Sequence, residues 1–487
     1  MSHSFPLSWL LSAFTLYTAL LFFISWLTSR KADSGSYFLG NKKSPWFVVA
    51  YGMIGASISG VTFISVPGNV MNTNFYYMPL VLGFVVGYAV IALVLLPLYY
   101  KMNLTSIYTY LERRFGLFSY RSGASVFMVS RILGASVRIF VVVLVLHNFL
   151  PEGFPFWIVA FIFMFLIFLY TFKGGVKTIV WTDVLQTTFM LLAVILTVVY
   201  IAKDMGWSFS QMSSAVSSSP YSNWFNMDWS ARTNVFKQFI SGIFITIVMT
   251  GLDQEMMQKN LSCKSLKDAQ KNIFTTSGTL VVINFLFLIL GAVLVLYVNA
   301  HLGGMEGIGV AKSDALFSAI ASRYLGLGVG LFFIIGLISA SYPSAGGALT
   351  SLTTSFCIDF AGFNNPQKHY SEVSKKRIRH CAHAGFALLF FVLIVVLYLV
   401  NNQAVIDLVY LLASYTYGPL LGLFFFGILT KHQVKDKFVP YIVVLSPVLC
   451  YVLDVVAKHY FDFGFGFTIL ILNGLFTFIG MWICKKR

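Results

Sequence analysis

The sequence predicts an all-α integral membrane protein with 13 transmembrane helices, and three observations support this fold class. Of 487 residues, 58% are hydrophobic and only 10% are charged, and the mean hydropathy is +0.81. Soluble domains carry about a quarter of their residues as charged side chains. The apolar residues form stretches long enough to cross a bilayer, and most cations fall in the short segments between them. A soluble enzyme and a disordered chain are therefore excluded.

Each apolar stretch was measured against the roughly 20 residues that a helix needs to cross a bilayer. The predicted spans are 7–28, 45–71, 76–100, 121–148, 155–172, 178–202, 235–252, 273–300, 324–347, 380–401, 404–430, 437–457 and 465–484. The first stretch lacks the basic flank and the small-residue cleavage site of a signal peptide, so we expect it to be a retained span.

The 33 Lys and Arg residues predict the orientation. If the C-terminus is cytoplasmic, 25 of them lie in cytoplasmic segments, Lys259 among them, six lie outside, and Arg131 and Arg138 lie within the fourth span. The positive-inside rule then places the N-terminus outside and the C-terminus in the cytoplasm of a multi-pass cell-membrane protein, such as one of a bacterial inner membrane. Lipid headgroups suffice as partners for these scattered cations, and neither nucleic acid nor an obligate protein partner is indicated.

The second span is unusually rich in small and polar residues. Between Gly52 and Gly68 it holds three glycines, four hydroxyl residues and a Pro-Gly pair. Close helix packing would explain small residues, but packing motifs repeat every four positions and these residues are crowded together. A helix break at mid-depth would instead free backbone carbonyls beside a polar site. The pattern favours a functional break over close packing.

The ninth span has a similar segment, Gly336 to Ser351, with Pro343 inside it. A proline cannot donate to the helix ladder and leaves a carbonyl about one turn earlier without its bond. Ser341 and Ser344 lie three residues apart, on one helix face. Together, the second and ninth spans could enclose one small cation.

Three ionisable residues lie inside the predicted spans. Asp183 either serves an ion path or lies shallow and meets Lys177 or a headgroup. Arg131 and Arg138 lie seven residues apart, on one face of the fourth span. Three roles are open for these arginines: they bind a substrate carboxylate, they pair with a buried acid, or they extend to the membrane interface. No catalytic constellation is readable, so we expect no enzyme.

Four segments together resemble the solute:sodium symporter family of sodium/sugar, sodium/proline and sodium/sialic-acid cotransporters. They are Asp33…Tyr37-Phe38-Leu39-Gly40 with Ser44-Pro45-Trp46, Tyr170-Thr171…Gly174-Gly175…Trp181-Thr182-Asp183…Gln186, Asp253-Gln254…Met257-Gln258…Leu261…Lys264…Asp268-Ala269, and Ala340…Ser344…Leu349-Thr350…Asp359. Their order and spacing extend over roughly residues 30 to 430.

The resemblance implies a core of two inverted five-helix repeats in which the first helix of each repeat is broken. The implied organisation is an extra span and loop at 1–44, a first repeat at 45–202, an outer loop at 203–234, a second repeat at 235–430 and two additional spans at 431–487. The matching half-site in the seventh span would lie around Gly242 to Gly251.

The resemblance also implies site residues. A sodium ion would bind the carbonyls of Gly55, Ile58, Ala340 and Pro343 and the hydroxyl of Ser344, with Asp183 behind it on the release path. Substrate contacts would fall on Ser57, Ser59 and Thr62, and Tyr76 or Tyr77 would form an outer gate.

The sequence departs from the family pattern at several positions. Pro343 replaces a serine, and Gly346 and Gly347 replace serines found in relatives with a second sodium site, so we expect one sodium ion per substrate. Val81 replaces the Glu or Gln that holds the solute in sugar and sialic-acid transporters. The arginine that binds sialic acid aligns nearest to Gly134, one turn from both Arg131 and Arg138.

The resulting interpretation is a sodium-coupled secondary symporter that imports a small polar organic solute, a sugar or a sialic-acid-like compound, by alternating access. The alternatives are a proton-coupled carrier of the same fold and a membrane solute sensor that retains the symporter fold.

Overall fold

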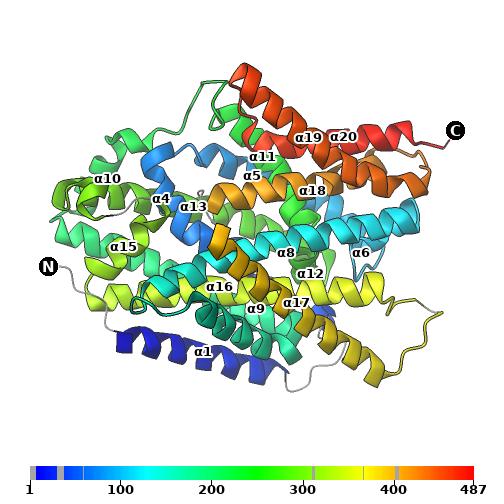
Figure 1. The fold of residues 1–487 in the computed structure, drawn as a ribbon, viewed down its shortest axis with the longest axis horizontal. Helices are drawn as coiled ribbons and strands as arrows, with labels where there is room; N and C mark the ends of the chain where they lie inside the picture. The colour runs from blue at the N-terminus through cyan, green and yellow to red at the C-terminus, as the bar shows by residue number, and fades with distance from the viewer. Residues whose placement is uncertain are drawn as a thin grey trace.

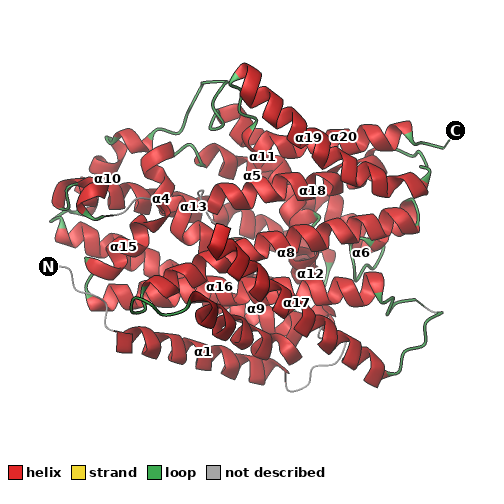
Figure 2. Ribbon diagram, viewed as in Figure 1, coloured by secondary structure: helices red, strands yellow, loops and turns green. Residues whose placement is uncertain are grey.

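The computed structural model describes residues 7–29, 38–58, 60–309, 313–365, 367–400 and 405–486. These residues are almost entirely helical, with no β-strand among them (Figure 2). The helices of the first half are α1 (Leu7–Ser29), α3 (Trp46–Ser57), α4 (Gly60–Thr73), α5 (Met78–Val90), α6 (Leu96–Lys101), α7 (Thr109–Arg114), α8 (Leu117–Asn148), α9 (Phe156–Asp204) and α10 (Phe209–Ser217). Those of the second half are α11 (Val235–Thr246), α12 (Gln254–Leu261), α13 (Leu266–His301), α14 (Gly304–Gly307), α15 (Leu316–Arg323), α16 (Leu327–Ser355), α17 (Glu372–Val400), α18 (Val405–Leu429), α19 (Val439–Phe461) and α20 (Ile469–Ile483).

The long helices account for the predicted spans. Within the described ranges, nine helices are long and apolar enough to cross a membrane, or eleven if each of two bent pairs is one span. Two shorter apolar helices, Phe156–Phe172 and Tyr415–Leu429, coincide with the predicted fifth and eleventh spans. The structure therefore confirms a multi-helix membrane bundle, whereas the count of 13 stays a prediction. Helix α1 begins towards one end of the long axis and α20 ends towards the other (Figure 1).

The predicted break in the second span is present. Helix α3 ends at Ser57, and Ile58 has non-helical backbone angles of φ −96° and ψ 89°. The segments Trp46–Ser57 and Thr62–Thr73 are bent by 51°. The Gly-Ser-rich sequence makes this bend possible because it places little side-chain bulk in the turn.

The seventh span is also bent, but at its end. Helix α11 continues into the π-helical turn Ile247–Gly251, and α12 follows after a change of direction of 67°. The expected half-site at Gly242 to Gly251 thus ends in the π-helical turn, and the bend itself lies just beyond it. Helix α12 is short and polar, yet it is buried along its whole length.

The central helix α9 joins the predicted fifth and sixth spans. A kink divides it at Gly175, whose φ of 55° and ψ of −150° fit glycine best. Its second half packs against the broken helix α3 and against α16, while α12 contacts the same group (Figure 1). The broken span, Asp183 and the Pro343 segment are therefore neighbours.

Close approach of α5 and α11 depends on two facing glycines. The Cα of Gly242 is only about 3 Å from the position of a Cβ on Gly83, and a Cβ on Gly242 would collide with the carbonyl of Leu80. Such stripes of small residues are how membrane helices pack tightly.

We expect Gly242→Ala to lower the free energy of unfolding by about 1–3 kcal/mol, because the methyl group must push two backbones apart. Thermal unfolding of the detergent-solubilised protein measures this effect. Gly278→Ala on α13 is the matched control, since nothing lies within 4 Å of its added Cβ. Equal melting temperatures for the two variants would contradict the packing argument.

Candidate functional site

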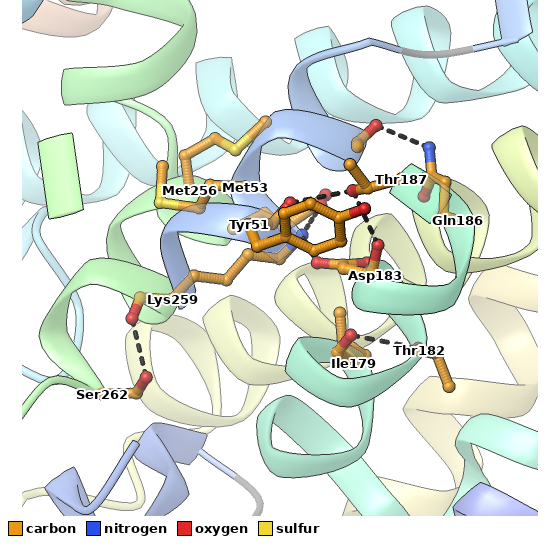
Figure 3. A network of polar contacts seen from close by, with 12 residues as sticks. Tyr51, Met53, Ile179, Thr182, Asp183, Gln186, Thr187, Met256, Lys259 and Ser262 are labelled. Carbon is orange, nitrogen blue, oxygen red and sulfur yellow. Dashed lines mark hydrogen bonds and ion pairs between the residues drawn. The ribbon is translucent and has the colours of Figure 1, made fainter. Parts of the chain in front are cut away.

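Three of the predicted carbonyl ligands converge on one point. The side-chain nitrogen Nε2 of Gln186 lies 2.5 Å from the carbonyl oxygen of Gly55 and 3.2 Å from those of Ile58 and Ala340. These carbonyls come from the broken second span and from α16, and Gln186 projects from α9 (Figure 3). The backbone break therefore creates a cluster of oxygens that face a single small volume.

The Gln186 amide satisfies this cluster only in part. An amide NH₂ group carries two protons, whereas three carbonyl oxygens lie around it. At least one carbonyl must therefore share a donor or remain under-satisfied, which is costly in a buried site. A bound cation has no such limit, because it interacts with all the surrounding oxygens at once.

The rest of the predicted sodium set lies on α16. Pro343 and Ser344 follow Ala340 within about one helical turn, and both are buried. Pro343 lies inside α16, which continues to Ser355. These two residues are therefore on the element that supplies the Ala340 carbonyl.

Asp183 is fully buried on α9, one turn before Gln186. Its carboxylate forms an ion pair with Lys259 of α12, with 2.7 Å between Oδ2 and Nζ. The alternative, in which Asp183 lies shallow and meets Lys177 or a headgroup, is wrong. The side chain is buried within the bundle, and its partner is Lys259. Its backbone carbonyl also accepts a hydrogen bond from Thr187 (Figure 3).

A cavity lies directly beside the broken helix. Its lining comprises Ala56, Ser57, Ile58, Thr62, Tyr77, Phe84, Tyr88, Arg131, Arg138, Ile245, Thr246, Met249, Thr250, Met256, Leu280 and Asn284. Ser57, Thr62 and Tyr77 of the expected substrate set are among these residues, as are both arginines. Ser59 lies outside the described residues. The cavity thus brings together a carboxylate-binding residue type, hydroxyls and apolar side chains.

Tyr77 lines this cavity and also a second one. The second cavity is lined by Val66, Asn69, Thr73, Asn74, Tyr76, Tyr77, Thr233, Gln238, Leu288 and Phe467. Tyr77 lines both cavities, whereas Tyr76 lines only the second. Of the two tyrosines expected at an outer gate, Tyr77 is therefore the one that borders both cavities.

Arg131 is 4% exposed and pairs with two carboxylates. Its Nη1 lies 3.5 Å from Oδ2 of Asp253, and its Nη2 contacts Oε2 of Glu255. Tyr417 donates a hydrogen bond to the same Asp253 oxygen at 2.9 Å. Of the three roles considered for Arg131, pairing with a buried acid is the one seen in the structure.

The charged residues of α12 were missed in the sequence. Lys259 was counted among the cytoplasmic loop cations, but it is 2% exposed and lies in the protein interior, because α12 turns back into the bundle. Glu255 is 3% exposed. Their i, i+4 spacing was a readable sign of an ion pair, but nothing in the sequence showed that the pair is buried.

The two glycines expected to exclude a second sodium site lie against other side chains. A Cβ at Gly346 would collide with the hydroxyl of Tyr170, and a Cβ at Gly347 would collide with the carboxylate of Glu255. The space that a larger residue would need is therefore already filled.

Comparison with known proteins agrees with this geometry. The family model described as the sodium:solute symporter family matches residues 37–436. The chain belongs to the sodium:solute symporter family. A sodium/sialic acid symporter of Aliivibrio fischeri is 23% identical over 92% of this chain and 88% of its own length. One from Proteus mirabilis is 22% identical over 86% of this chain and 84% of its own length.

A solved structure has the same fold as this symporter. It is the substrate-bound outward-open state of a Na⁺-coupled sialic acid symporter, with a TM-score of 0.83 at 18% identity. The match covers 98% of this chain and 99% of the other. The predicted class of fold, a multi-pass helical symporter fold, is thereby confirmed.

We expect Gln186→Leu to lower the free energy of unfolding by about 1–3 kcal/mol in sodium-free buffer, because three buried carbonyls lose their donor. Thermal unfolding in detergent measures the loss. The control is Gln270→Leu, whose amide donates to one carbonyl, that of Ala92. If both variants lost the same stability, the three-carbonyl cluster would not be the special feature of Gln186.

Proposed function

We propose that this symporter moves one sodium ion together with a small polar solute that carries a carboxylate, a sialic-acid-like compound being the favoured class. The observation that carries the proposal is the convergence of the Gly55, Ile58 and Ala340 carbonyls beside a cavity that contains Arg138.

The oxygen cluster supports sodium as the coupling ion. Hard cations prefer oxygen ligands, and backbone carbonyls and hydroxyls are such ligands. The proposed set is the carbonyls of Gly55, Ile58, Ala340 and Pro343 with the hydroxyl of Ser344. Binding there would replace the partial satisfaction provided by Gln186 and would order the broken helix against α16. Asp183 would then stand behind the ion on its release path.

The charge balance around the cavity favours an anionic solute. Arg131, Lys259, Asp183, Asp253 and Glu255 form one network of ion pairs. When all are ionised, two cations face three anions, so one negative charge remains. Arg138 lines the cavity beside this network, and a bound sodium ion would add one further positive charge. A solute carboxylate would help to offset positive charge in such a buried site.

The position of Arg138 supports a direct role in binding. Arg131 pairs with two carboxylates, and Arg138, one heptad further along α8, also lines the cavity. A guanidinium group binds a carboxylate through two parallel hydrogen bonds. Val81 stands where sugar and sialic-acid transporters carry the Glu or Gln that holds the solute, so that contact is missing here.

Transport would follow alternating access. With the N-terminus outside and the C-terminus in the cytoplasm, Tyr77 and the second cavity lie on the outer side of the solute. The α12 ion pairs then lie on the inner side. Sodium binding would favour one arrangement of the bundle, and the loaded symporter would rock to expose both cargoes inward.

We expect Ser344→Ala to raise the sodium concentration for half-maximal uptake by about tenfold or more, because one oxygen ligand is lost. Uptake into proteoliposomes at fixed pH measures this shift. Ser351→Ala is the control, since that hydroxyl lies on the same helix and donates to Ala348. Unchanged sodium dependence in Ser344→Ala would falsify the sodium site. Full uptake in sodium-free buffer would favour the proton-coupled alternative.

We expect Arg138→Gln to weaken binding of N-acetylneuraminate by about tenfold to a hundredfold in the presence of sodium, because a charge-assisted pair is lost. A thermal-shift titration measures the affinity. Arg121→Gln, at an exposed position of the same helix, is the control. Equal affinity in the two variants would show that Arg138 does not hold the carboxylate.

A further inference from the structure

Lys259 lies between two buried carboxylates. Its Nζ is 2.7 Å from Oδ2 of Asp183 and 3.1 Å from Oε1 of Glu255. The side chains of all three are at most 3% exposed. The lysine reaches from α12 towards α9 (Figure 3), so its ammonium group joins two helices that are separate in sequence.

A compact cation at this point balances charges that could not remain buried alone. An ionised carboxylate in a low-dielectric interior needs a partner of opposite charge. Asp183 and Glu255 share the ammonium group of Lys259, and Glu255 also pairs with Arg131. The second oxygen of Asp183, Oδ1, is buried and has no hydrogen-bond partner among the described residues. Oxygen ligands for a cation therefore surround the lysine nitrogen.

The location is one helical turn from the proposed sodium ligands. Asp183 and Gln186 lie three residues apart and therefore share a face of α9. Gln186 contacts the carbonyl cluster, while Asp183 contacts Lys259. The ammonium group is thus a positive charge held about one turn of α9 away from the proposed sodium site.

Gly347 is what allows this arrangement. A Cβ at position 347 would collide with the carboxylate of Glu255. Glycine leaves room for Glu255 to lie beside α16 and contact Lys259. The absence of a side chain at Gly347 thus leaves the space that Glu255 occupies, and Glu255 in turn pairs with Lys259.

We propose that the Lys259 ammonium group is a tethered cation that takes the place of a second coupling ion. The proposal rests on the proposed sodium-coupled function and deepens it. Lys259 neutralises Asp183 and Glu255 with a charge that is not transported, so one sodium ion suffices for each cycle. Removal of the ammonium group leaves carboxylate oxygens from Asp183 and Glu255 around a space the size of a small cation, and that space then binds sodium.

Equilibrium binding of ²²Na⁺ to the purified full-length protein tests the proposal. The wild-type protein binds one sodium ion. Lys259→Met, which keeps an unbranched apolar stem and has no atom in place of Nζ, binds two, and the Hill coefficient of sodium-induced thermal stabilisation rises from about one towards two. Lys259→Arg keeps the charge and stays at one sodium ion.

Two further variants serve as controls. Lys458→Met removes a lysine from another i, i+4 pair, with Asp454 at 2.6 Å, and binds one sodium ion as the wild type does. Lys259→Met/Glu255→Gln loses one positive and one negative charge and also one ligand group, so it returns to one sodium ion.

Folding of each variant is measured in parallel by size-exclusion chromatography, once in sodium buffer and once in choline buffer. A Lys259→Met protein that is folded only in sodium supports the proposal, because the ion then replaces the ammonium group. A folded Lys259→Met protein that binds one sodium ion overturns it, as does a variant that unfolds equally in both salts. Two sodium ions bound to the double variant would also overturn it. Absence of sodium binding by the wild type would instead contradict the proposed function itself.

Discussion

The structure depends on one constraint: backbone carbonyls exposed by a helix break inside a membrane must find partners within the protein. At Ile58 the second span leaves its helical course, and the carbonyls of Gly55 and Ile58 meet that of Ala340 from α16. A single amide, that of Gln186, lies among them. Its two protons cannot satisfy all three carbonyls fully, which leaves oxygen lone pairs that a cation could use.

This incomplete satisfaction gives a physical basis for coupling. A cation at the cluster would hold the broken span and α16 together, and the solute cavity is lined by residues of the same broken span, Ser57, Ile58 and Thr62. Ordering of this segment by an ion would therefore also shape the cavity. Arg131 belongs both to the wall of this cavity and to the ion-pair network on α12. The carbonyl cluster, the cavity and the charge network thus meet on α8, α9 and the broken span.

Much of the fold followed from the sequence because the bilayer imposes a length and a polarity on each helix. The break near Ile58 was predictable, since glycine and hydroxyl residues crowd together there without the spacing of a packing motif. The carbonyl set was predictable only through the family resemblance. Gln186 itself was not assigned a role, although its position one turn after Asp183 placed it on the same face. Its three acceptors are 131, 128 and 154 residues away in sequence.

The buried charges of α12 were the main failure of the prediction. A short polar segment after an apolar span is typical of a loop. The sequence therefore predicted that Lys259 is a cation of the cytoplasmic surface. The 67° bend that returns α12 to the interior is a tertiary effect without a local signal. The same holds for Arg131, whose role was left open because its acidic partners are more than 120 residues further along the chain.

The most direct test of the central claim is a pair of cryo-electron-microscopy maps of this symporter, one in sodium and one in choline. The account predicts density for an ion between the carbonyls of Gly55, Ile58 and Ala340 in sodium, with the Gln186 amide moved away from them. In choline the Gln186 amide should lie within hydrogen-bonding distance of the three carbonyls. Identical density at the cluster in both salts would contradict the account.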